Sequence, residues 1–444
     1  MSENVVRDLG DGLALRRATV RDTEGLVAFH ADIHRDPGME EPEQYVAAWV
    51  RDLMERPHPT FQPSDFTIVE HSATGEIVSS LCLISQTWAY EGIEFGVGRP
   101  ELVGTRPDYR RRGLVRAQME LIHQWSAERG ERLQAITGIP YYYRQFGYEM
   151  TMTLGGGRGG SGSSVPKLKE GEAEPYRLRL AKEEDLGLIA QVYREGAARW
   201  PVVCVRDAAL WRHELNGMSD KNVNRRDLCI IETAEGEPVG FVNRSPRLWR
   251  GRVGIGAYEL TPGVSWLDVT PSVMRHLWSH GEALAAGDPE QTMETFGFWL
   301  GTEHPALELF KRRLPQILKP YAWYLRVPDL AGFLQLVSPA LEERLAASLL
   351  SGHTGELKIS FYQGGLWLRF EAGRVTGVEP WQPTREAEGE AGFPGLTFLQ
   401  LVFGYRTVQE LQDAFPDCWT ANDGAQVLLD VLFPQQASDV WPIS

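Results

Sequence analysis

The chain has 444 residues, and its 60 Asp and Glu residues outnumber its 45 Lys and Arg residues, so the formal net charge is −15. At about 150 residues per domain this length predicts about three domains, enough to bury a core without disulfides. The acidic surplus argues against a nucleic-acid binder and favours cationic substrates or partners.

Cysteine usage and hydropathy exclude further classes. The four cysteines are scattered and form no C-x-x-C pair, which argues against a disulfide framework or a structural zinc site. No apolar run approaches the ~18 residues of a membrane span, and Met1–Asn4 lacks the basic and apolar regions of a signal peptide. We therefore expect a cytoplasmic protein without a membrane partner or a metal.

An internal echo suggests that one unit occurs twice. Leu15–Ala18 followed by Asp22 matches Leu178–Ala181 followed by Asp185, and in both places a short strand leads into an amphipathic helix. We interpret this as two copies of one αβ unit, in which the Asp carboxylate caps the first turn of the helix. The alternative is a chance match.

The segment after the first long strand carries the most chemistry. A strand is predicted to end at Leu102–Thr105, a turn follows at Pro107, and an amphipathic helix starts after Arg110–Gly113. Free N–H groups at a helix start favour an anion, Gly113 allows a close approach, and the arginines add forked donors. The pattern indicates a pyrophosphate site, the alternative being a solvated basic patch.

Two later regions bear on domain organisation. Gly155–Ser164 is low-complexity and is predicted to be a flexible connection, followed by the charged stretch Lys167–Pro175. Beyond Pro328 we expect a small α+β domain. Its predicted elements are a helix over Phe333–Leu350, a hairpin of Leu357–Phe361 and Leu366–Phe370, and helices over Leu396–Val402 and Ala425–Leu432.

Three motifs resemble the GNAT acetyltransferases. The run Arg110-x-x-Gly113-x-Val115 looks like motif A, which in that superfamily cradles the pyrophosphate of acetyl-CoA. The opening with Arg16, Ala18 and Asp22, repeated in the second copy, looks like the usual start of a GNAT domain. The segment Tyr143–Tyr148 matches motif B.

The order of the whole chain resembles the enhanced intracellular survival family. That resemblance implies an α/β (α+β) fold of tandem GNAT domains with mixed central sheets, followed by a domain like sterol carrier protein type 2. The implied parts are a catalytic domain (1–160), a Gly/Ser-rich and charged linker (161–175), a degenerate GNAT-like domain (176–327) and the carrier-like domain with the C-terminal carboxylate (328–444).

The resemblance also implies the cofactor contacts. Acetyl-CoA is expected as co-substrate, with its pantetheine chain hydrogen-bonded to strand backbone as an added strand would be. The implied contacts are Val103, Gly104, Thr105, Arg111, Arg112, Gly113, Leu114, Val115, Arg116, Gly138 and Ile139.

The catalytic roles follow from the same match. Tyr143 corresponds to the family's general acid, which protonates the leaving thiolate; the alternative is a packing aromatic within the strand-like run Tyr141–Tyr143. The family's base is the C-terminal carboxylate, here that of Ser444. Glu94 and Glu101 remain alternative bases, and for each of them an exposed strand-edge charge is the competing interpretation.

The second copy lacks these cofactor-binding and catalytic motifs. Trp266–Leu277 has no Arg-rich, Gly-containing turn, and Leu309–Leu314 resembles motif B without its glycine, so we expect no acetyl-CoA site there. His276 and His280 are four residues apart on a predicted helix, but two histidines without a third ligand are more often packed or surface residues than a metal site.

The sequence thus predicts an acetyl-CoA-dependent N-acetyltransferase acting on cationic amines such as aminoglycosides, polyamines or lysine side chains. The alternatives are a lipid or small-molecule carrier or scaffold that uses the last domain, and a protein or peptide N-acetyltransferase. The resemblance further implies a homo-oligomer, often a hexamer.

Overall fold

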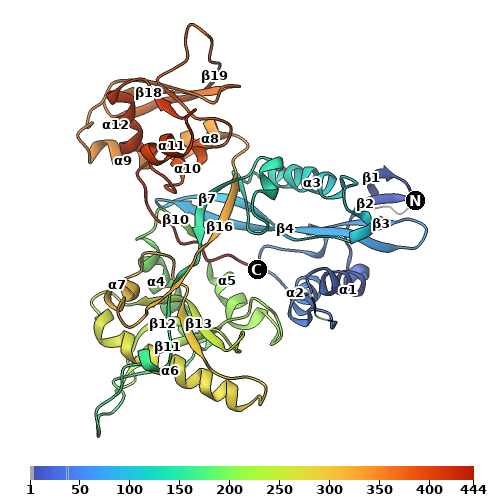
Figure 1. The fold of residues 1–444 in the computed structure, drawn as a ribbon, viewed down its shortest axis with the longest axis vertical. Coiled ribbons are helices and arrows are strands. Elements are labelled where there is room, and N and C mark those ends of the chain that lie inside the picture. The colour runs from blue at the N-terminus through green and yellow to red at the C-terminus, as the bar shows by residue number, and fades with distance from the viewer. Residues whose placement is uncertain (1–4, 37, 39) are drawn as a thin grey trace.

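The computed structural model of the chain describes residues 5–36, 38 and 40–444. Residues 1–4, on which the prediction about a leader segment rests, lie outside the described residues. Three sheets divide the molecule, and Figure 1 shows them as three lobes with the C-terminus between them. Among the described residues, no helix combines the length and apolar character needed to cross a bilayer.

The first sheet has helices on both faces. Helix α3 covers one face, and α1 and α2 cover the other (Figure 1), each through its own apolar cluster. The helices are α1 (Thr23–Ile33), α2 (Gln44–Glu55) and α3 (Leu114–Glu128). The strands, in sheet order, are β1 (Val5–Gly10), β2 (Leu13–Arg17), β3 (Phe66–His71), β4 (Glu76–Tyr90), β5 (Ile93–Thr105), β6 (Leu133–Ile136), β16 (Tyr321–Arg326) and β7 (Glu149–Leu154), with β10 (Val202–Cys204) on β4.

The second sheet repeats this plan. Helices α4 and α6 cover its two faces, and a parallel pair, β13 with β14, matches the parallel pair of β5 with β6. Its strands, in order, are β15 (Gln316–Leu318), β8 (Gly157–Gly160), β14 (Thr295–Phe298), β13 (Arg252–Leu260), β12 (Pro238–Arg244), β11 (Asp227–Thr233) and β9 (Tyr176–Leu180). Its helices are α4 (Leu186–Ala197), α5 (Ala208–Arg212), α6 (Trp266–Ala286) and α7 (Pro305–Leu309).

The two sheets exchange one strand each. β16 follows the second unit in sequence but lies between β6 and β7 of the first sheet, while β8 follows the first unit but lies between β14 and β15 of the second. The prediction of a flexible Gly155–Ser164 is therefore wrong over β8. The glycines serve close packing: a Cβ at Gly157 would lie 2.0 Å from the Phe298 oxygen, and one at Gly159 would lie 2.7 Å from that of Phe296.

The echoed Arg and Asp residues form one arrangement twice. Arg16 donates to both oxygens of Asp22 and to Glu70, and Arg179 donates to both oxygens of Asp185 and to Glu232. The predicted cap on the helix is wrong in detail. Each Asp instead accepts a backbone N–H from three residues earlier, because its carboxylate is turned toward the arginine.

The third domain is an α+β unit that packs on the far ends of β4 and β5, where Phe333 meets Tyr90 and Phe95 edge to face. The predicted hairpin forms, but the predicted helix over Phe333–Leu350 breaks at Val337, two residues before Pro339, which has no N–H to donate. Its sheet order is β19 (Arg374–Trp381), β18 (Gly365–Glu371), β17 (Gly355–Ser360), β20 (Ala391–Gly392) and β21 (Trp419–Thr420), with α8 (Leu330–Leu336), α9 (Ser338–Ala346), α10 (Phe398–Val402), α11 (Val408–Ala414) and α12 (Asp423–Leu432).

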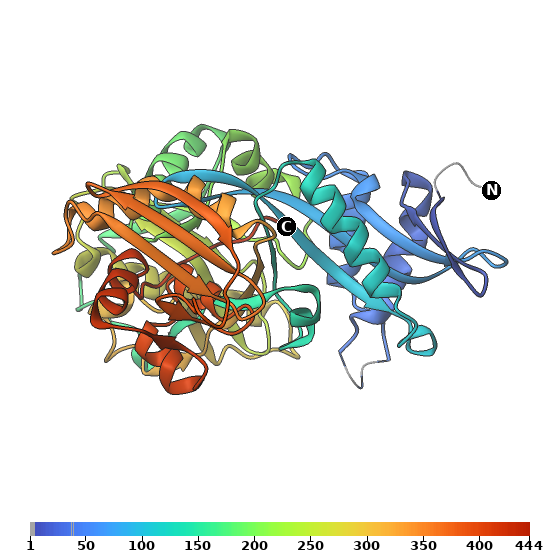
Figure 2. The same ribbon diagram turned by 90° about the horizontal axis from the view of Figure 1, so that it is seen from above.

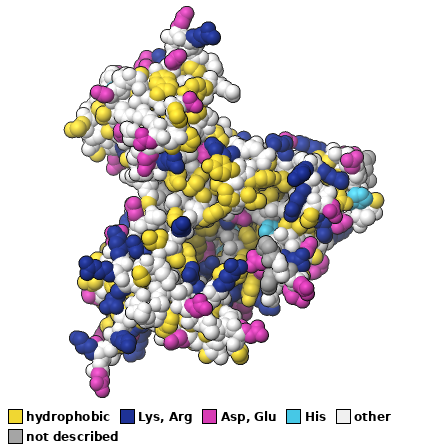
Figure 3. Space-filling view, viewed as in Figure 1, with side chains coloured by type: hydrophobic (Ala, Val, Ile, Leu, Met, Phe, Trp, Pro, Cys, Tyr) yellow, Lys and Arg dark blue, Asp and Glu magenta, His cyan; other side chains and the backbone are white. Residues whose placement is uncertain are grey.

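The long strands of the first sheet set the shape of the molecule. Seen from above in Figure 2, the N-terminal end of the first domain points away from the other two domains. The space-filling view in Figure 3 shows this face hollowed near its centre, between the first and second domains. The candidate site lies on the first sheet, around the C-terminal end of β5.

Candidate active site

A defect in the first sheet opens a cavity. The β4–β5 ladder shifts register between Ser80 and Cys82, and Leu102 opposite the shift has a left-handed φ of 54°, as in a bulge. Within the described chain, β5 pairs with β6 only through Val97 and Gly98, so the strands separate beyond that point. A cavity of about 950 Å³ lies between the end of β5 and the segment that follows β6.

One wall of the cavity is a free strand edge. Val103, Gly104 and Thr105 line it from β5, and Gly138 and Ile139 line it from the opposite side. Backbone N–H and C=O groups on an unpaired edge can receive an extended ligand as an added strand. A Cβ at Gly104 would lie 2.9 Å from Ile33 of α1, so glycine lets the helix pack close behind this edge.

The mouth of the cavity is suited to an anion. Arg111 and Gly113 have left-handed φ values of 63° and 76°, so successive N–H groups turn toward one side, and Gly113 caps α3 without a side chain. Among the described residues, the arginines of this turn and of the first turn of α3 have no acidic partner; they are Arg110, Arg111, Arg112 and Arg116. Positive charge and free N–H groups together fit a pyrophosphate.

Most of the predicted cofactor residues meet in this cavity. Arg111, Gly113, Leu114, Val115 and Arg116 line it. Arg112 does not line it, because its guanidinium lies 5.1 Å over the Tyr109 ring instead.

Tyr143 also lines the cavity. It lies in a 3-10 turn (Tyr142–Phe146) and not in a strand, because the left-handed φ of 62° at Tyr141 turns the chain just before it. Its ring is buried edge-on against Tyr142 and Tyr148, and Gly138 gives it room. Burial first, and then the negative charge of Glu101, raise the pKa of Tyr143. The phenol therefore stays protonated at neutral pH and can donate.

Ser444 lies outside this cavity. It is buried where the C-terminal segment runs between the domains, and its main-chain oxygen receives Nε2 of His58 (3.3 Å) and of His213 (3.2 Å). Nδ1 of His58 accepts from Thr60, so Nε2 carries the proton donated to Ser444. Burial lowers the pKa of His58 to about 3, so this imidazole is neutral at pH 7.

One ion pair connects Ser444 to the cavity. Arg99 donates to the Ile443 carbonyl (2.5 Å) and to the Ser444 hydroxyl (3.2 Å), and its other terminal nitrogen pairs with Glu101. Glu101 lines the cavity and also accepts from Thr137 (3.5 Å). The structure thus brings Tyr143 and Glu101 to one cavity. Ser444 lies outside that cavity and is linked to it through Arg99.

Glu94 is not brought to the site. It is exposed beside the β4–β5 turn, opposite Ala89, seven residues along β5 from Glu101. At ~3.3 Å per residue that separation is about 23 Å along the strand.

Sequence reasoning missed His34, which lines the cavity just past the end of α1. Its Nδ1 donates to the His30 carbonyl (3.1 Å), so Nε2 is left with its lone pair. Burial lowers the pKa of His34, while the negative charge of Glu101 works against that shift. No local motif signals this residue, because only the packing of α1 on β5 brings it to the site.

The two helical histidines of the second copy have ordinary partners. His276 is 2.7 Å from Arg244, and His280 donates to the Ser245 carbonyl at 3.0 Å. In the part of the chain that the structure describes, no three His, Cys, Asp or Glu residues gather as metal ligands would.

Comparison with known proteins now bears on this geometry. Residues 15–151 match a family model described as an acetyltransferase (GNAT) domain, which covers the bulge, the arginine-rich turn and Tyr143. The chain thus carries an acyltransferase domain of the GNAT type. The family model does not extend over the second and third domains, and no curated protein matches the chain.

Solved structures show the same fold over nearly the whole chain. A protein of unknown function from Enterococcus faecalis V583, described as a probable N-acyltransferase, matches at 14% identity, covering 96% of this chain and 97% of that one, with a TM-score of 0.65. Eis1 from Mycobacterium abscessus matches at 15% identity, 96% and 98% coverage and a TM-score of 0.58. N-myristoyltransferase from Saccharomyces cerevisiae, solved with myristoyl-CoA, matches at 12% identity, 74% and 81% coverage and a TM-score of 0.50.

Proposed function

We propose that this protein is an acetyl-CoA-dependent N-acetyltransferase that acts on amines of cationic acceptors such as aminoglycosides, polyamines or lysine side chains. The observation that carries the proposal is the single cavity that combines a free strand edge, an arginine-rich helix start and a protonated phenol. When bound, acetyl-CoA supplies a thioester from which an uncharged amine can take the acetyl group.

The binding roles follow the cavity from its mouth inward. Arg111, Gly113 and Arg116 hold the pyrophosphate with charge and N–H groups, and Arg112 adds charge at the mouth. Val103, Gly104 and Thr105 hydrogen-bond the pantetheine chain through their backbone. Leu114 and Val115 supply apolar contact at the helix start, and Gly138 and Ile139 form the opposite wall.

Proton transfer needs an acid and a base. Tyr143 donates its phenolic proton to the departing sulfur, and its place in the cavity beside the strand edge supports that role. The base that we propose is the main-chain carboxylate of Ser444, which is supported by the five side chains that hold residues 441–444 in place: Gln86, Arg99, Arg206, His58 and His213. Glu101 is the alternative base because it lines the cavity itself.

Other parts of the proposal concern the whole protein. The net charge of −15 supports cationic acceptors through long-range attraction. We further propose that the third domain is of the sterol-carrier-protein-2 type, and that the protein is a cytoplasmic homo-oligomer.

The test is CoA release, followed with a thiol reagent, across a panel of polyamines, aminoglycosides and lysine peptides. The expected result is release whose rate depends on both acetyl-CoA and one class of amine. Absence of both release and acetyl-CoA binding would overturn the proposal and favour a carrier or scaffold. Release with lysine peptides alone would instead assign a protein or peptide acetyltransferase.

A further inference from the structure

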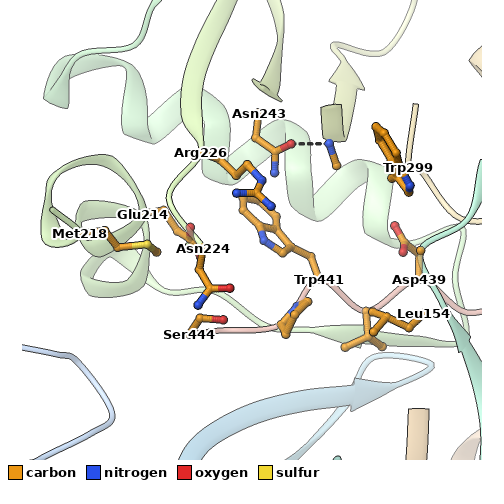
Figure 4. Close-up of a pocket in the computed structure, with 14 residues that line it drawn as sticks. Leu154, Glu214, Met218, Asn224, Arg226, Asn243, Trp299, Asp439, Trp441 and Ser444 are labelled. Atoms are coloured by element: carbon orange, nitrogen blue, oxygen red, sulfur yellow. Dashed lines mark hydrogen bonds between the residues drawn. The ribbon is translucent and has the colours of Figure 1, made fainter. Parts of the chain in front are cut away.

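A second cavity, of about 230 Å³, lies between the second sheet and the C-terminal segment (Figure 4). Asn243 and Gly256 face it from β12 and β13, and Asn224 and Arg226 face it from the segment before β11. Leu154 closes it from the first domain, and the residues that close it from the C-terminal segment are Asp439, Val440, Trp441, Pro442 and Ser444.

Three side chains that line this cavity carry N–H groups for which the described residues provide no acceptor: Nε and Nη2 of Arg226, Nδ2 of Asn224 and Nδ2 of Asn243. Arg226 uses Nη1 on the carbonyls of Val223 (3.2 Å) and Arg225 (2.7 Å), and among the described residues no carboxylate lies within 4.0 Å of its guanidinium. The Nδ2 group of Asn224 is buried and has no hydrogen-bond partner. Asn243 is held by two N–H groups on its oxygen, from Gly256 and Ala257, which turns its Nδ2 to the cavity (Figure 4).

The charge around Arg226 is not balanced locally. Burial, and then the positive charge of Arg247, lower the pKa of Arg226, while the negative charge of Glu214 works against that shift. Glu214 lines the same cavity, but its Oε1 already accepts from Arg206 (3.2 Å). A buried guanidinium with free N–H groups is costly unless an anion completes it.

The opposite side of the cavity carries an unpaired acid. Asp439 has neither an ion pair nor a hydrogen bond within the described chain, and Figure 4 shows it across the cavity from Asn224. Burial raises the pKa of Asp439 to about 6, so it is mostly ionised at pH 7. A ligand that spans the cavity therefore meets donors on one side and a carboxylate on the other.

The size and walls of the cavity further restrict which ligands it can hold. Its volume lies below the ~300–1,000 Å³ of sites for drug-sized ligands, so a trisaccharide-sized acceptor does not fit. Trp299 and Trp441 give it apolar walls. We propose that this cavity binds a free amino acid, with the carboxylate on Arg226, Asn224 and Asn243 and the ammonium toward Asp439.

A chain of side-chain contacts links this cavity to the acetyl-CoA cavity. Ser444 lines this second cavity and bonds Arg99, whose partner Glu101 lines the acetyl-CoA cavity. The Ser444–Arg99–Glu101 chain of contacts thus connects the two cavities. Binding of the amino acid stands without the proposed function, but an effect of that binding on acetyl transfer through Ser444 and Arg99 rests on it.

The experiment is a calorimetric titration without acetyl-CoA, using the twenty common amino acids and the carboxamide of each one that binds. The amide removes only the negative charge, so we expect its affinity to be at least tenfold lower. Arg226→Gln should weaken the amino acid at least tenfold and leave the amide unchanged. Arg225→Gln is the matched control, because Arg225 does not line the cavity and pairs with the exposed Asp220.

Two further readouts keep the result interpretable. Asn224→Ala removes an amide without a partner in the folded chain, so it should lower affinity without lowering the melting temperature. Binding should also change the fluorescence of Trp299 and Trp441 in the wild type. Absence of binding by every amino acid, or equal affinity for acid and amide, would overturn the proposal, whatever the outcome of the CoA-release assay.

Discussion

The first and second domains share one arrangement of strands and helices but differ where the helix after the long strand begins, at α3 and α6. In the first, α3 starts after Gly113, with no side chain on the free N–H groups and no acid in the first turn. In the second, α6 starts after Ser265, whose hydroxyl accepts the Asp268 N–H (3.3 Å), and Asp268 puts a negative charge in the first turn. The same helix start is thus open to an anion in one copy and closed in the other.

The two domains also differ in the loop that follows the parallel strand, β6 in the first and β14 in the second. After β6 the chain forms the 3-10 turn that carries Tyr143, whereas after β14 it forms α7, capped by the buried His304. Both ring nitrogens of His304 are engaged, one by the Tyr258 carbonyl (2.9 Å) and one by the Ala306 N–H (3.2 Å). The second copy retains the architecture but uses this position for structure, which teaches that the fold alone does not make the site.

The largest effect is expected from removing the phenol of Tyr143, a group that the second copy does not have at this position. Tyr143→Phe removes the only proton that the phenol can donate, so kcat should fall by about a hundredfold or more, with KM for acetyl-CoA unchanged. Tyr142→Phe is the control, since that neighbour also lines the cavity. Steady-state CoA release measures both, and an unchanged kcat for Tyr143→Phe removes it from the mechanism.

A second variant gives the first copy the closed helix start of the second. Gly113→Asp adds a carboxylate where a pyrophosphate would lie and forces a residue with a side chain into φ 76°, so acetyl-CoA affinity should fall about tenfold or more. Gly130→Asp is matched to it, because Gly130 has φ 71° and open space at the other end of α3. Equal loss of affinity in both variants would contradict the anion site.

The duplicated ion clusters allow a comparison of stability. The Arg16 side chain is 12% exposed and that of Arg179 is 33% exposed. Solvent therefore screens the ion pairs of Arg16 less, and losing them should cost more stability. We expect Arg16→Met to lower the free energy of unfolding by about 3 kcal/mol and Arg179→Met by about 1 kcal/mol. Urea titration decides this, and a larger loss for Arg179→Met would show that burial does not set the order.

The smallest expected effect concerns acid sensitivity of the second copy. Burial lowers the pKa of His304 to about 3, below its ordinary value near 6.5, so the unfolded chain binds the extra proton between these values. This contribution to stability is complete above pH 6.5 and is lost as pH falls toward 3. His304→Asn keeps a capping oxygen but cannot titrate, so its melting temperature should fall less steeply from pH 7 to 4.5; parallel curves would contradict this.

Sequence reasoning reached the parts of the site that depend on local order. The Arg110–Gly113 turn is visible because strand, turn and helix follow one another in the chain, and the copy beginning near Leu178 is visible because its Arg and Asp keep their spacing. The strand exchange was not predictable, because β8 and β16 pair far from their sequence neighbours. His34 was missed for the same reason, since tertiary packing brings it to the cavity.

The most direct test of the account is the stoichiometry of acetyl-CoA binding to the wild-type chain, measured by calorimetric titration. An open helix start in the first copy and a closed one in the second predict one equivalent per chain. Two equivalents would contradict the contrast between the copies, and no binding would contradict the acetyl-CoA site itself.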